Sequence, residues 1–487
     1  MNPKKITSLA YRRSDFPTKL NLVVVILLLG NFLAWQLAAF GQTTTSEPQN
    51  TSRTQATAVE HVITSPSDVL IVALKQGADR QQFDDLLQEV HGTYIRTINA
   101  GPNLQFLVVQ AEPGKVTEVQ QKLRKDKNVA LVERNCQYRA QDTGWSNAEA
   151  ASLHRKFANN HHHNFFAPHP HNTFPHNLNP HNPHNPGPPS QLTGSPDDPL
   201  LYLQWNLSFM HFFQARDLPA VNTSSVANYY FLDTGVVPNS DFPVVISQYD
   251  FSTDNSTGNK IPFSDPAGHG TLTSSITAWT DNKFGLAGLS NLEGQRCTLT
   301  MLQITADPQG FSSLLRIVNA LSFIASTPGL PAGPINISFA SQQGQPSLNS
   351  NAAIQAVAQQ LILKNFLVVL GAGNNAEQDP SPELYCRRVA GINQSGSLAS
   401  FSDFGPAIFA AAPATAIPGY FTGGGVFTAD GTSFAAPAWC AAVATAMAAK
   451  PGINASQADS IIIKAASRTA QGLLVPNLEA ALRSLGY

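Results

Sequence analysis

Three short segments in the second half of the sequence carry polar residues of the kinds used in acyl transfer. Asp233 ends the apolar run 227–233, His269 lies in Gly268-His-Gly-Thr271, and Ser433 lies in Gly431-Thr-Ser-Phe-Ala-Ala-Pro437. A nucleophilic serine needs an imidazole as its base and a carboxylate that orients the imidazole. These residue types therefore predict nucleophilic catalysis, provided that the fold brings them together.

Each of the three residues also has an ordinary structural interpretation. An Asp-Thr-Gly sequence often forms the turn after a strand, a lone histidine is most often a structural or surface residue, and a serine at a helix start is often a cap. Thr432 could take the capping role in place of Ser433, and Pro437 makes the first helical turn rigid. Beyond residue 197 the sequence contains only two histidines, His211 and His269, so these are the only histidine candidates for the catalytic base.

The segments around these residues alternate between apolar strands and helices. We expect a doubly wound, mostly parallel α/β sheet covered on both faces, because the strands are apolar throughout and helices join them. Functional residues collect at the carboxyl ends of strands in such a sheet, which is where Asp233 stands. The expected strands are 227–232, 298–304, 335–339 and 366–370, and the expected helices are 311–325, 352–365, 434–449, 455–466 and 477–484.

A second, smaller unit is predicted over residues 67–140. Apolar strands at 69–74, 94–98, 104–109 and 129–132 alternate with two helices, which contain Phe83 and Val119 at helical spacing. The order β-α-β-β-α-β is that of a small ferredoxin-like α+β domain.

Taken together, the three polar segments resemble the Asp, His and Ser signature blocks of the subtilisin-like serine proteases (subtilases, peptidase family S8), in that family's order. The stretch 198–207 is also similar to the D-P-x-x-x-x-Q-W-x-L opening of many subtilase catalytic domains, and 281–288 resembles the N-x-x-G-V-x-G loop of the family. The resemblance covers residues 197–487. It implies a secreted serine endopeptidase with Asp233, His269 and Ser433 as its catalytic triad; the alternative is a catalytically weak or inactive subtilase-like binding protein.

The resemblance extends to the groups around the triad. Asn374 in 370–375 matches the oxyanion-hole asparagine of the family, although Asn375 is chemically equivalent and one of the two would then only shape the turn. The substrate-binding residues that the resemblance implies are Ser338, Phe339 and Ala340 on a strand that pairs with the substrate backbone, and Gly371, Ala372 and Gly373 as another wall of the specificity pocket.

Three positions depart from the family pattern. Ser275 stands where the helix after the histidine commonly has glycine, Ala340 replaces the glycine of the pocket strand, and Trp439 places a bulky indole behind the helix that begins at the serine. None of these changes removes a catalytic group. They leave the substrate preference open.

The resemblance gives the smaller unit a role and suggests the partners of the chain. Residues 67–140 look like the inhibitory propeptide of secreted subtilases, which would be cut off somewhere between Asn135 and Pro196. The expected partners are therefore polypeptide substrates and the chain's own propeptide, and we expect a monomer. With a net charge of −2 and a pI of about 6.7, we expect no nucleic acid partner.

The remaining segments indicate export. Residues 1–41 place a basic stretch before an apolar run and are interpreted as a signal peptide, with an uncleaved membrane anchor as the alternative. We expect the stretch 42–66 to be a flexible spacer. Residues 141–196, rich in His, Asn and Pro, are expected to be a disordered linker, with metal binding by the His tract as the alternative. The rest of the chain would lie outside the cytoplasm.

The chemistry needs no cofactor, although calcium is common in the family as a structural ion. Asp198, Asp241 and Asn282 stand near the family's ligand positions, but solvated loop residues are an equal interpretation, so we assign no metal ligand. The four cysteines have no metal-ligand spacing; without Cys136 at most one disulfide is expected, and Cys440 is expected to pack as a small apolar residue.

Overall fold

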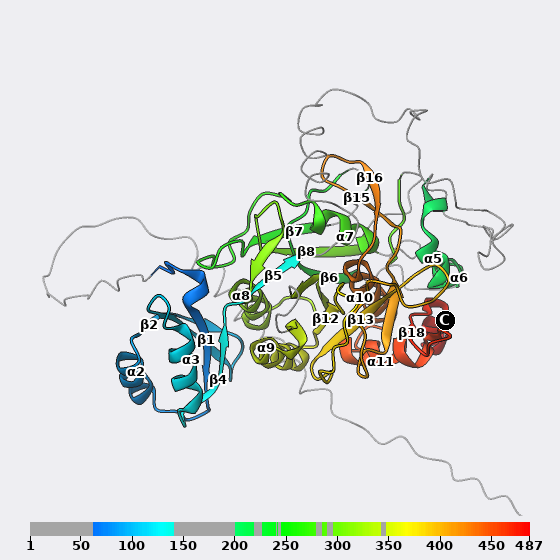
Figure 1. Cartoon of the computed structure of the whole chain (residues 1–487). Helices are drawn as coiled ribbons and strands as arrows, with labels where there is room; N and C mark the ends of the chain where they lie inside the picture. The colour runs from blue at the N-terminus through cyan, green and yellow to red at the C-terminus, as the bar shows by residue number, and fades with distance from the viewer. Residues whose placement is uncertain are drawn as a thin grey trace, which may run out of the picture. The chain divides into compact units, whose positions relative to one another are not determined.

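Two lobes carry the secondary structure of the protein (Figure 1): an N-terminal lobe of residues 62–136 and a C-terminal lobe of residues 200–487. The structure is a computed structural model that describes residues 62–140, 200–218, 226–239, 241, 245–278, 285–289, 296–341 and 347–487. The predicted signal peptide, most of the spacer, the His-rich linker, Asp198 and Asn282 lie outside the described residues.

The N-terminal lobe is a four-stranded antiparallel sheet with two helices. The strands lie in the order β2-β3-β1-β4, as in the predicted ferredoxin-like arrangement. Its elements are β1 (Val69–Leu74), α2 (Arg80–Glu89), β2 (Gly92–Asn99), β3 (Gln105–Ala111), α3 (Val116–Lys125) and β4 (Val129–Arg134).

Both faces of this small sheet are buried. Along β1, Leu70 and Val72 belong to the lobe's own core, whereas Val69 and Ile71 belong to a core cluster of the C-terminal lobe. Successive residues of a strand point to opposite faces, so a continuously apolar strand needs a cover on each side. Here α2 and α3 cover one face, and the C-terminal lobe covers the other.

The C-terminal lobe is built on a nine-stranded sheet in the order β17-β18-β14-β13-β12-β10-β6-β8-β7. Every neighbouring pair is parallel except β17 with β18, which confirms the predicted doubly wound sheet. The strands are β6 (Val226–Asp233), β7 (Val245–Asp250), β8 (Arg296–Gln303), β10 (Pro334–Ile337), β12 (Leu367–Gly371), β13 (Cys386–Ile392), β14 (Ala410–Pro413), β17 (Ser467–Arg468) and β18 (Leu474–Val475).

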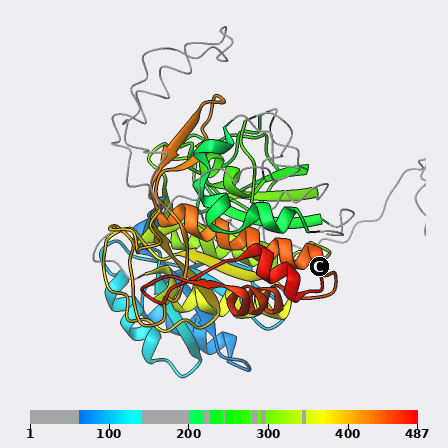
Figure 2. The ribbon, with the colours of Figure 1, turned by 90° about the vertical axis from the view of Figure 1, so that its right-hand side faces the viewer.

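Helices cover both faces of this sheet. On one face α8 (Leu314–Ser326) and α9 (Ala352–Leu363) pack into one core cluster; the other cluster contains α10 (Thr432–Ala449) and the C-terminal helices. Figure 2 shows α10, in orange, running along the sheet next to the red C-terminal helices. The remaining helices are α5 (Trp205–Phe209), α6 (Phe212–Arg216), α7 (His269–Ala278), α11 (Ala455–Ala465) and α12 (Leu478–Ser484).

Helix α10 is a core helix. Among the described helices it alone is long and apolar enough to span a bilayer, but 94% of that stretch is buried inside the protein. None of the four cysteines, all of which lie in described residues, forms a disulfide, and Cys440 is buried within α10, as predicted.

Two of the predicted elements were wrong at one end. Residues 311–313, expected to open a helix, form the short strand β9 (Phe311–Ser313), because β5 pairs with them and the Ser313 hydroxyl caps α8. The expected strand 335–339 is two strands: β10 stays in the main sheet, and β11 (Phe339–Ser341) leaves it after Ser338.

Strand β5 (Gln137–Ala140) links the two lobes. It leaves the N-terminal lobe and lies antiparallel between β11 and β9 of the C-terminal lobe in a three-stranded sheet (Figure 1). Tyr138 in this strand is fully buried, in the same core cluster as Phe339 and Leu314.

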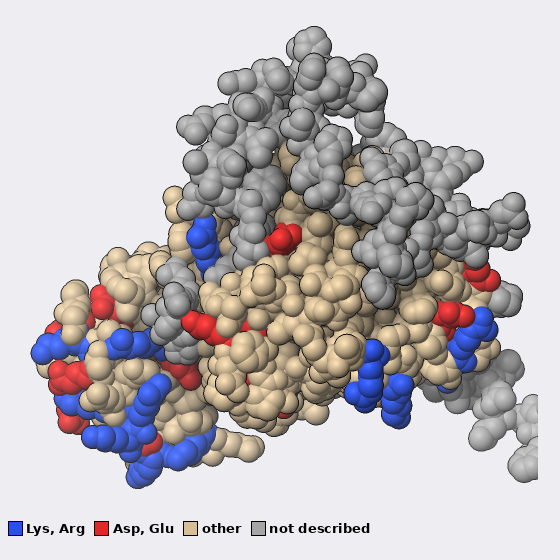
Figure 3. Space-filling view, turned by 45° about the vertical axis from the view of Figure 1, so that its right-hand side comes forward, with Lys and Arg blue, Asp and Glu red and all other residues tan. Residues whose placement is uncertain are grey.

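Charged side chains are unevenly distributed over the face shown in Figure 3. The blue and red side chains crowd over the N-terminal lobe, and the visible surface of the C-terminal lobe is mainly uncharged. The low charged fraction of the sequence, 13%, is therefore most evident on the C-terminal lobe.

Candidate active site

Asp233 and His269 form a buried pair at the carboxyl end of β6. Asp233 is the last residue of the strand, His269 is the first residue of α7, and Nδ1 of His269 lies 2.6 Å from Oδ1 of Asp233. A carboxylate can only accept, so Nδ1 donates and Nε2 is left as the basic nitrogen. Asp233 also accepts from the Thr234 backbone N–H at 2.7 Å and from the Thr273 hydroxyl at 3.1 Å.

A second buried carboxylate holds the two segments that carry this pair. Asp265 accepts from the hydroxyl of Thr234 at 2.6 Å, from the N–H of Gly268 at 2.9 Å, and from both the N–H and the hydroxyl of Thr271. Burial raises the pKa of Asp265, and the bonds from Thr234 and Thr271 partly oppose that rise. Sequence reasoning missed this residue; its only signal was an acid four residues before the histidine.

Ser433 lies in the first turn of α10 and is 3% exposed. Its hydroxyl donates to the backbone oxygen of Ser338 at 3.4 Å, and the Ser338 hydroxyl donates to the backbone oxygen of Ser433 at 3.0 Å. The next residue, Phe339, stacks edge-on against the His269 ring, with 6.1 Å between ring centroids. The dipeptide 338–339 therefore contacts both the serine and the histidine.

Asn374 is tied to the residue before this serine. Its side-chain oxygen accepts from the backbone N–H of Thr432 at 2.9 Å and from the Thr432 hydroxyl at 2.8 Å. This fixes the orientation of the amide, because the oxygen is the acceptor in both bonds. Asn375 is held differently: its backbone N–H donates to Asp403 at 2.8 Å. The two asparagines are therefore not equivalent.

Five of the six expected pocket residues line one hollow. These are Phe339, Ala340 and the stretch 371–373, which lie on β11 and at the end of β12, whereas Ser338 does not line it and is hydrogen-bonded to Ser433. Gly373 has φ of +121°, and a Cβ there would lie 2.0 Å from Oδ2 of Asp403. Only glycine fits this position without displacing the carboxylate.

This arrangement agrees with the family to which the sequence matches. Residues 230–487 match the Subtilase family, and they contain Asp233, His269, Asn374 and Ser433 in the positions described above. The chain belongs to the subtilase family.

Two characterised relatives show the extent of the sequence similarity. A thermostable alkaline protease of Halalkalibacterium halodurans is 27% identical over 238 residues, which is 48% of this chain and 59% of the relative. The subtilisin-like serine protease Pen ch 13.0101 of Penicillium rubens is 27% identical over 248 residues, which is 49% of this chain and 56% of the relative. The chain thus spans less than two thirds of the length of these subtilases.

Solved structures share the fold. Fervidolysin from Fervidobacterium pennivorans, a keratinolytic enzyme related to subtilisin, superposes with a TM-score of 0.62 over 85% of this chain and 61% of that chain, at 16% sequence identity. A protease from Pseudoalteromonas arctica superposes with a TM-score of 0.50 over 60% of this chain and 99% of that chain, at 21% identity.

The departures from the common subtilase pattern are accommodated by packing. The Ser275 hydroxyl donates to the Leu272 backbone oxygen at 2.6 Å and accepts from the Tyr420 N–H at 3.2 Å. The missing glycine of this helix is offset by Gly419 on the facing strand β15 (Ile417–Tyr420), where a Cβ would lie 2.6 Å from the Ser275 hydroxyl. Trp439 is fully buried, and its indole N–H donates to Asp459 at 2.8 Å.

Three charged residues at the pocket were not foreseen from the sequence. Asp379, Arg388 and Asp403 line the hollow with the expected residues, and Arg388 is 1% exposed. Asp403 accepts from the backbone N–H groups of Asn375 and Glu377 at 2.8 and 3.0 Å, which fastens the loop after Asn374. The pair Arg387-Arg388 next to the apolar stretch 389–392 is the signal that sequence reasoning overlooked.

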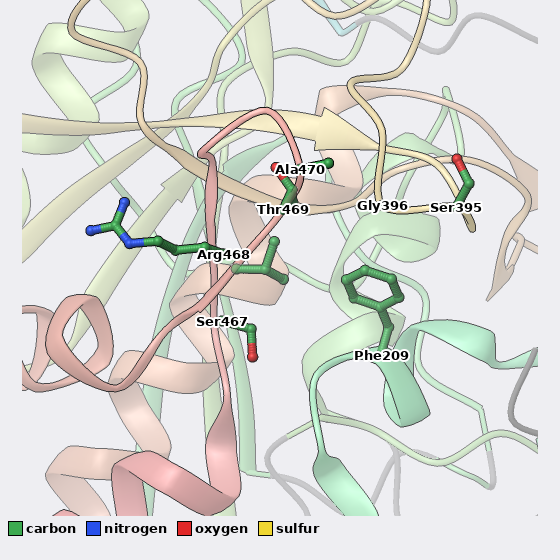
Figure 4. A pocket seen from close by; sticks show the side chains of 8 residues that line it. Phe209, Ser395, Gly396, Ser467, Arg468, Thr469 and Ala470 are labelled. Carbon is green, nitrogen blue, oxygen red and sulfur yellow. The ribbon is translucent and has the colours of Figure 1, made fainter. Parts of the chain in front are cut away.

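A second hollow lies away from this site (Figure 4). It is lined by residues of several loops and short elements, including Phe209, Gly396 and Thr469. In the view the Arg468 side chain extends away from Phe209, so the hollow offers little chemistry. None of the residues predicted for catalysis lines it.

Of the three residues near the family's calcium-ligand positions, which were not assigned as ligands, the structure describes only Asp241. This residue is fully buried, and its Oδ2 accepts from the Leu286 N–H at 3.1 Å and the Tyr420 hydroxyl at 2.8 Å. In the described part of the chain no group of three or more His, Cys, Asp or Glu side chains is arranged to hold a metal ion. Structural calcium stays a prediction.

Proposed function

We propose that this subtilase is a serine endopeptidase that is made as a self-inhibited precursor. The observation that carries the proposal is the buried bond of 2.6 Å between Asp233 and His269, beside the rigid helix start that bears Ser433. The roles below follow from that geometry and from membership of the family.

The reaction begins with a proton transfer from Ser433 to His269. Nε2 takes the proton of the Ser433 hydroxyl as Oγ attacks the carbonyl carbon of the scissile peptide bond, and Asp233 stabilises the imidazolium that forms. When the tetrahedral intermediate collapses, the C–N bond breaks and His269 gives its proton to the leaving amine. Water, activated by the same imidazole, then hydrolyses the acyl-enzyme and restores the serine.

The developing oxyanion would be held by two donors. Asn374 presents its side-chain oxygen to Thr432, so its amide nitrogen is the donor directed at the substrate, and the backbone N–H of Ser433 is the second. Both donors are fixed before the substrate arrives, which is the condition under which such hydrogen bonds accelerate the reaction.

The peptide substrate would bind as β5 binds in the precursor. The β5 strand pairs on one side with β11, with Arg139 opposite Ala340, and on the other side with β9. The Ala140 N–H also donates to the backbone oxygen of Gly310 at 3.0 Å. Backbone pairing on two edges can hold an extended peptide independently of its side chains. It also supports the N-terminal lobe as an inhibitor that blocks this groove.

Reactivity of Ser433 tests the proposal. The full-length chain is expected to cut itself within 135–196 and to be labelled by an organophosphonate serine probe. The Ser433→Ala variant should stay at full length and take no label. Processing that persists in that variant, after purification from other proteases, would falsify the assigned nucleophile.

Export is part of the same proposal. A precursor whose N-terminal lobe blocks the substrate groove would be inactive until it is cut. The apolar run in residues 1–41 is the sequence feature that would direct it out of the cytoplasm. Detection of the processed chain in the medium, in the membrane fraction or in the cytoplasm distinguishes a cleaved signal, a retained anchor and no export.

A further inference from the structure

The hollow next to Ser433 has apolar walls and a buried ion pair. Its apolar walls are Phe339, Leu370 and Ala372, but Arg388 and Asp379 also line it. Nη1 of Arg388 lies 2.8 Å from Oδ2 of Asp379, while Nη2 donates to the Ser381 backbone oxygen. The ion pair neutralises both charges inside the pocket.

This pair leaves hydrogen-bonding groups unused. Nε and Nη1 of Arg388 and Oδ2 of Asp379 are buried and have no partner with hydrogen-bond geometry among the described residues; the contact between Nη1 and Oδ2 is an ion pair with poor angles. Buried polar groups are normally hydrogen-bonded, so unused donors and an unused acceptor in a pocket point to a group that arrives from outside.

The chemistry of the pair selects among the groups that could arrive. A carboxylate would be attracted by Arg388 but repelled by Asp379 and by Asp403, which also lines the hollow. An ammonium or guanidinium group would be attracted by these two carboxylates but repelled by Arg388. An aromatic side chain would leave all three atoms unsatisfied, and leaving buried polar groups without a partner is unfavourable. A carboxamide offers an oxygen to Arg388 and an N–H to Asp379, and it carries no charge.

We propose that Arg388 and Asp379 make this pocket specific for a glutamine-type carboxamide side chain at the residue before the cut. This inference rests on the proposed function, because it assigns the pocket to a peptide that Ser433 cleaves. Arg388 and Asp379 are specificity-determining residues in this proposal and take no part in bond breaking.

The strand register of β5 indicates which peptide bond of the chain itself could be the first one cleaved. Tyr138 lies opposite Ser341, Arg139 opposite Ala340 and Ala140 opposite Phe339. A peptide continued by one residue in the same antiparallel register reaches Ser338, whose backbone oxygen accepts from the Ser433 hydroxyl. In the sequence the residue after Ala140 is Gln141, whose side chain is a carboxamide. The expected first cut is therefore between Gln141 and Asp142.

A peptide series tests the preference. The processed enzyme is assayed on Gln-Tyr-Arg-Ala-Xaa-4-nitroanilides in which Xaa is Gln, Glu, Lys or Phe. We expect kcat/KM for Gln to exceed each of the others by about tenfold or more, since a site built to hydrogen-bond a polar group rejects analogues that lack it. Mass spectrometry of the processed chain should give Asp142 as its first residue.

Variants of the pair separate a specific role from a structural one. Arg388→Met should lower the ratio of Gln to Phe cleavage about tenfold. Asp379→Asn removes the repelling carboxylate and should raise the ratio of Glu to Gln cleavage about tenfold, which a general loss of structure cannot do. Arg387→Met is the matched control: Arg387 binds Asp459 and Glu383 and does not line the pocket, so both ratios should stay unchanged.

Labelling by the organophosphonate probe is measured in every sample. It reports the reactivity of Ser433 and does not depend on which side chain the pocket prefers. Two results would contradict the carboxamide pocket but leave the proposed function standing. In the first, the enzyme takes the label but prefers Phe or Lys. In the second, it takes the label but its cleavage ratios do not change in Arg388→Met and Asp379→Asn. A chain that neither takes the label nor cuts any peptide overturns the proposed function itself. A first residue other than Asp142 overturns the inferred register.

Discussion

Asn374 and Asn375 are adjacent residues of the same type in different environments. The side chain of Asn374 is held against Thr432, the neighbour of Ser433, whereas Asn375 contributes its backbone N–H to Asp403. Of these two asparagines, only Asn374 therefore has its side chain fixed beside the proposed nucleophile. The difference cannot be read from the dipeptide, because it depends on a helix start 58 residues away in the sequence.

Asn374→Ala should lower kcat on a peptide anilide by about 10²–10³-fold with little change in KM, as loss of one oxyanion donor does. Steady-state kinetics, with probe labelling to count active sites, measures the effect. Asn375→Ala is the matched control and should stay within about threefold of the parent. Equal losses in the two variants would contradict the assignment of Asn374 as the donor.

Asp265 is a positioning residue for the Asp233–His269 pair. Asp265→Asn keeps the shape of the side chain but replaces one accepting oxygen by an NH₂ group, which then faces other donors. We expect kcat to fall about 10–100-fold, since a misplacement on the scale of 1 Å can cost 10²-fold, and stability to fall by about 2–4 kcal/mol.

Kinetics and thermal denaturation are measured together on Asp265→Asn and on Asp217→Asn, a surface control. A stability loss without a loss in kcat per labelled site would mean that Asp265 supports the fold alone. Unchanged values in both measurements would show that its four hydrogen bonds are dispensable.

At the scale of elements, helix α7 and strand β15 show how a family position can change without a change of fold. The close approach that a glycine on the helix commonly allows is provided here by Gly419 on the strand, opposite Ser275. The steric requirement is the same, but the residue that meets it lies on the other element.

Gly419→Ala should destabilise the protein by about 1–3 kcal/mol through overpacking, because the new Cβ would lie 2.6–2.7 Å from Ser275 and Leu272. Chemical denaturation measures the change. Adding Ser275→Gly should recover only part of the loss, since the Leu272 backbone oxygen is also in contact. Full stability in the single Gly419→Ala variant would show that this contact is not tight.

Some of the strands and helices could be predicted from the sequence, and others could not. Strands such as β6 and β12 were recognised because apolar runs of that length match only a buried strand, and α10 was recognised from its small-residue run. Residues 311–313 were misassigned to a helix, and the division of the expected strand 335–339 before Phe339 was missed. Both follow from pairing with β5, which lies more than 160 residues away. Local pattern cannot report such pairing.

Asp233, His269 and Ser433 could be singled out from the sequence as candidates because each stands in a short motif of fixed spacing. Asp265, Asp403 and the Arg388–Asp379 pair could not, because their roles come from contacts that the fold creates. The only sign in a sequence that a charged residue will be buried is that its neighbours are apolar. This sign was present at Arg387 and Arg388 but was not used.

At the scale of the whole molecule, the N-terminal lobe docks by burying one face of its sheet and by capping two helices of the C-terminal lobe. Asn135 accepts from the Leu315 N–H at the start of α8 at 2.8 Å, and Glu133 accepts from the Ala352 N–H at the start of α9 at 3.3 Å. Side-chain acceptors at helix N-termini satisfy backbone donors that the helix leaves open. Docking is therefore directional as well as apolar.

Glu133 makes this docking depend on pH. Burial raises the pKa of its carboxyl above the ordinary 4.5, and the Ala352 N–H and Arg124 lower it only in part. The docked state thus binds a proton more tightly than the undocked state. Ionised Glu133 weakens docking at neutral pH, and that penalty disappears as the pH falls through the raised pKa towards 4.5.

Glu133→Gln, made in the uncut Ser433→Ala chain, keeps an oxygen for Ala352 but cannot ionise. It should be more stable than the parent at pH 7.5, by about 1.4 kcal/mol for each unit by which the pKa is raised. This difference should shrink towards zero as the pH approaches 4.5. Urea denaturation at several pH values measures it. Glu118→Gln is the control of opposite sign, because Lys122 lowers the pKa of the exposed Glu118. A difference for Glu133→Gln that stays constant with pH would show that Glu133 does not couple protonation to docking.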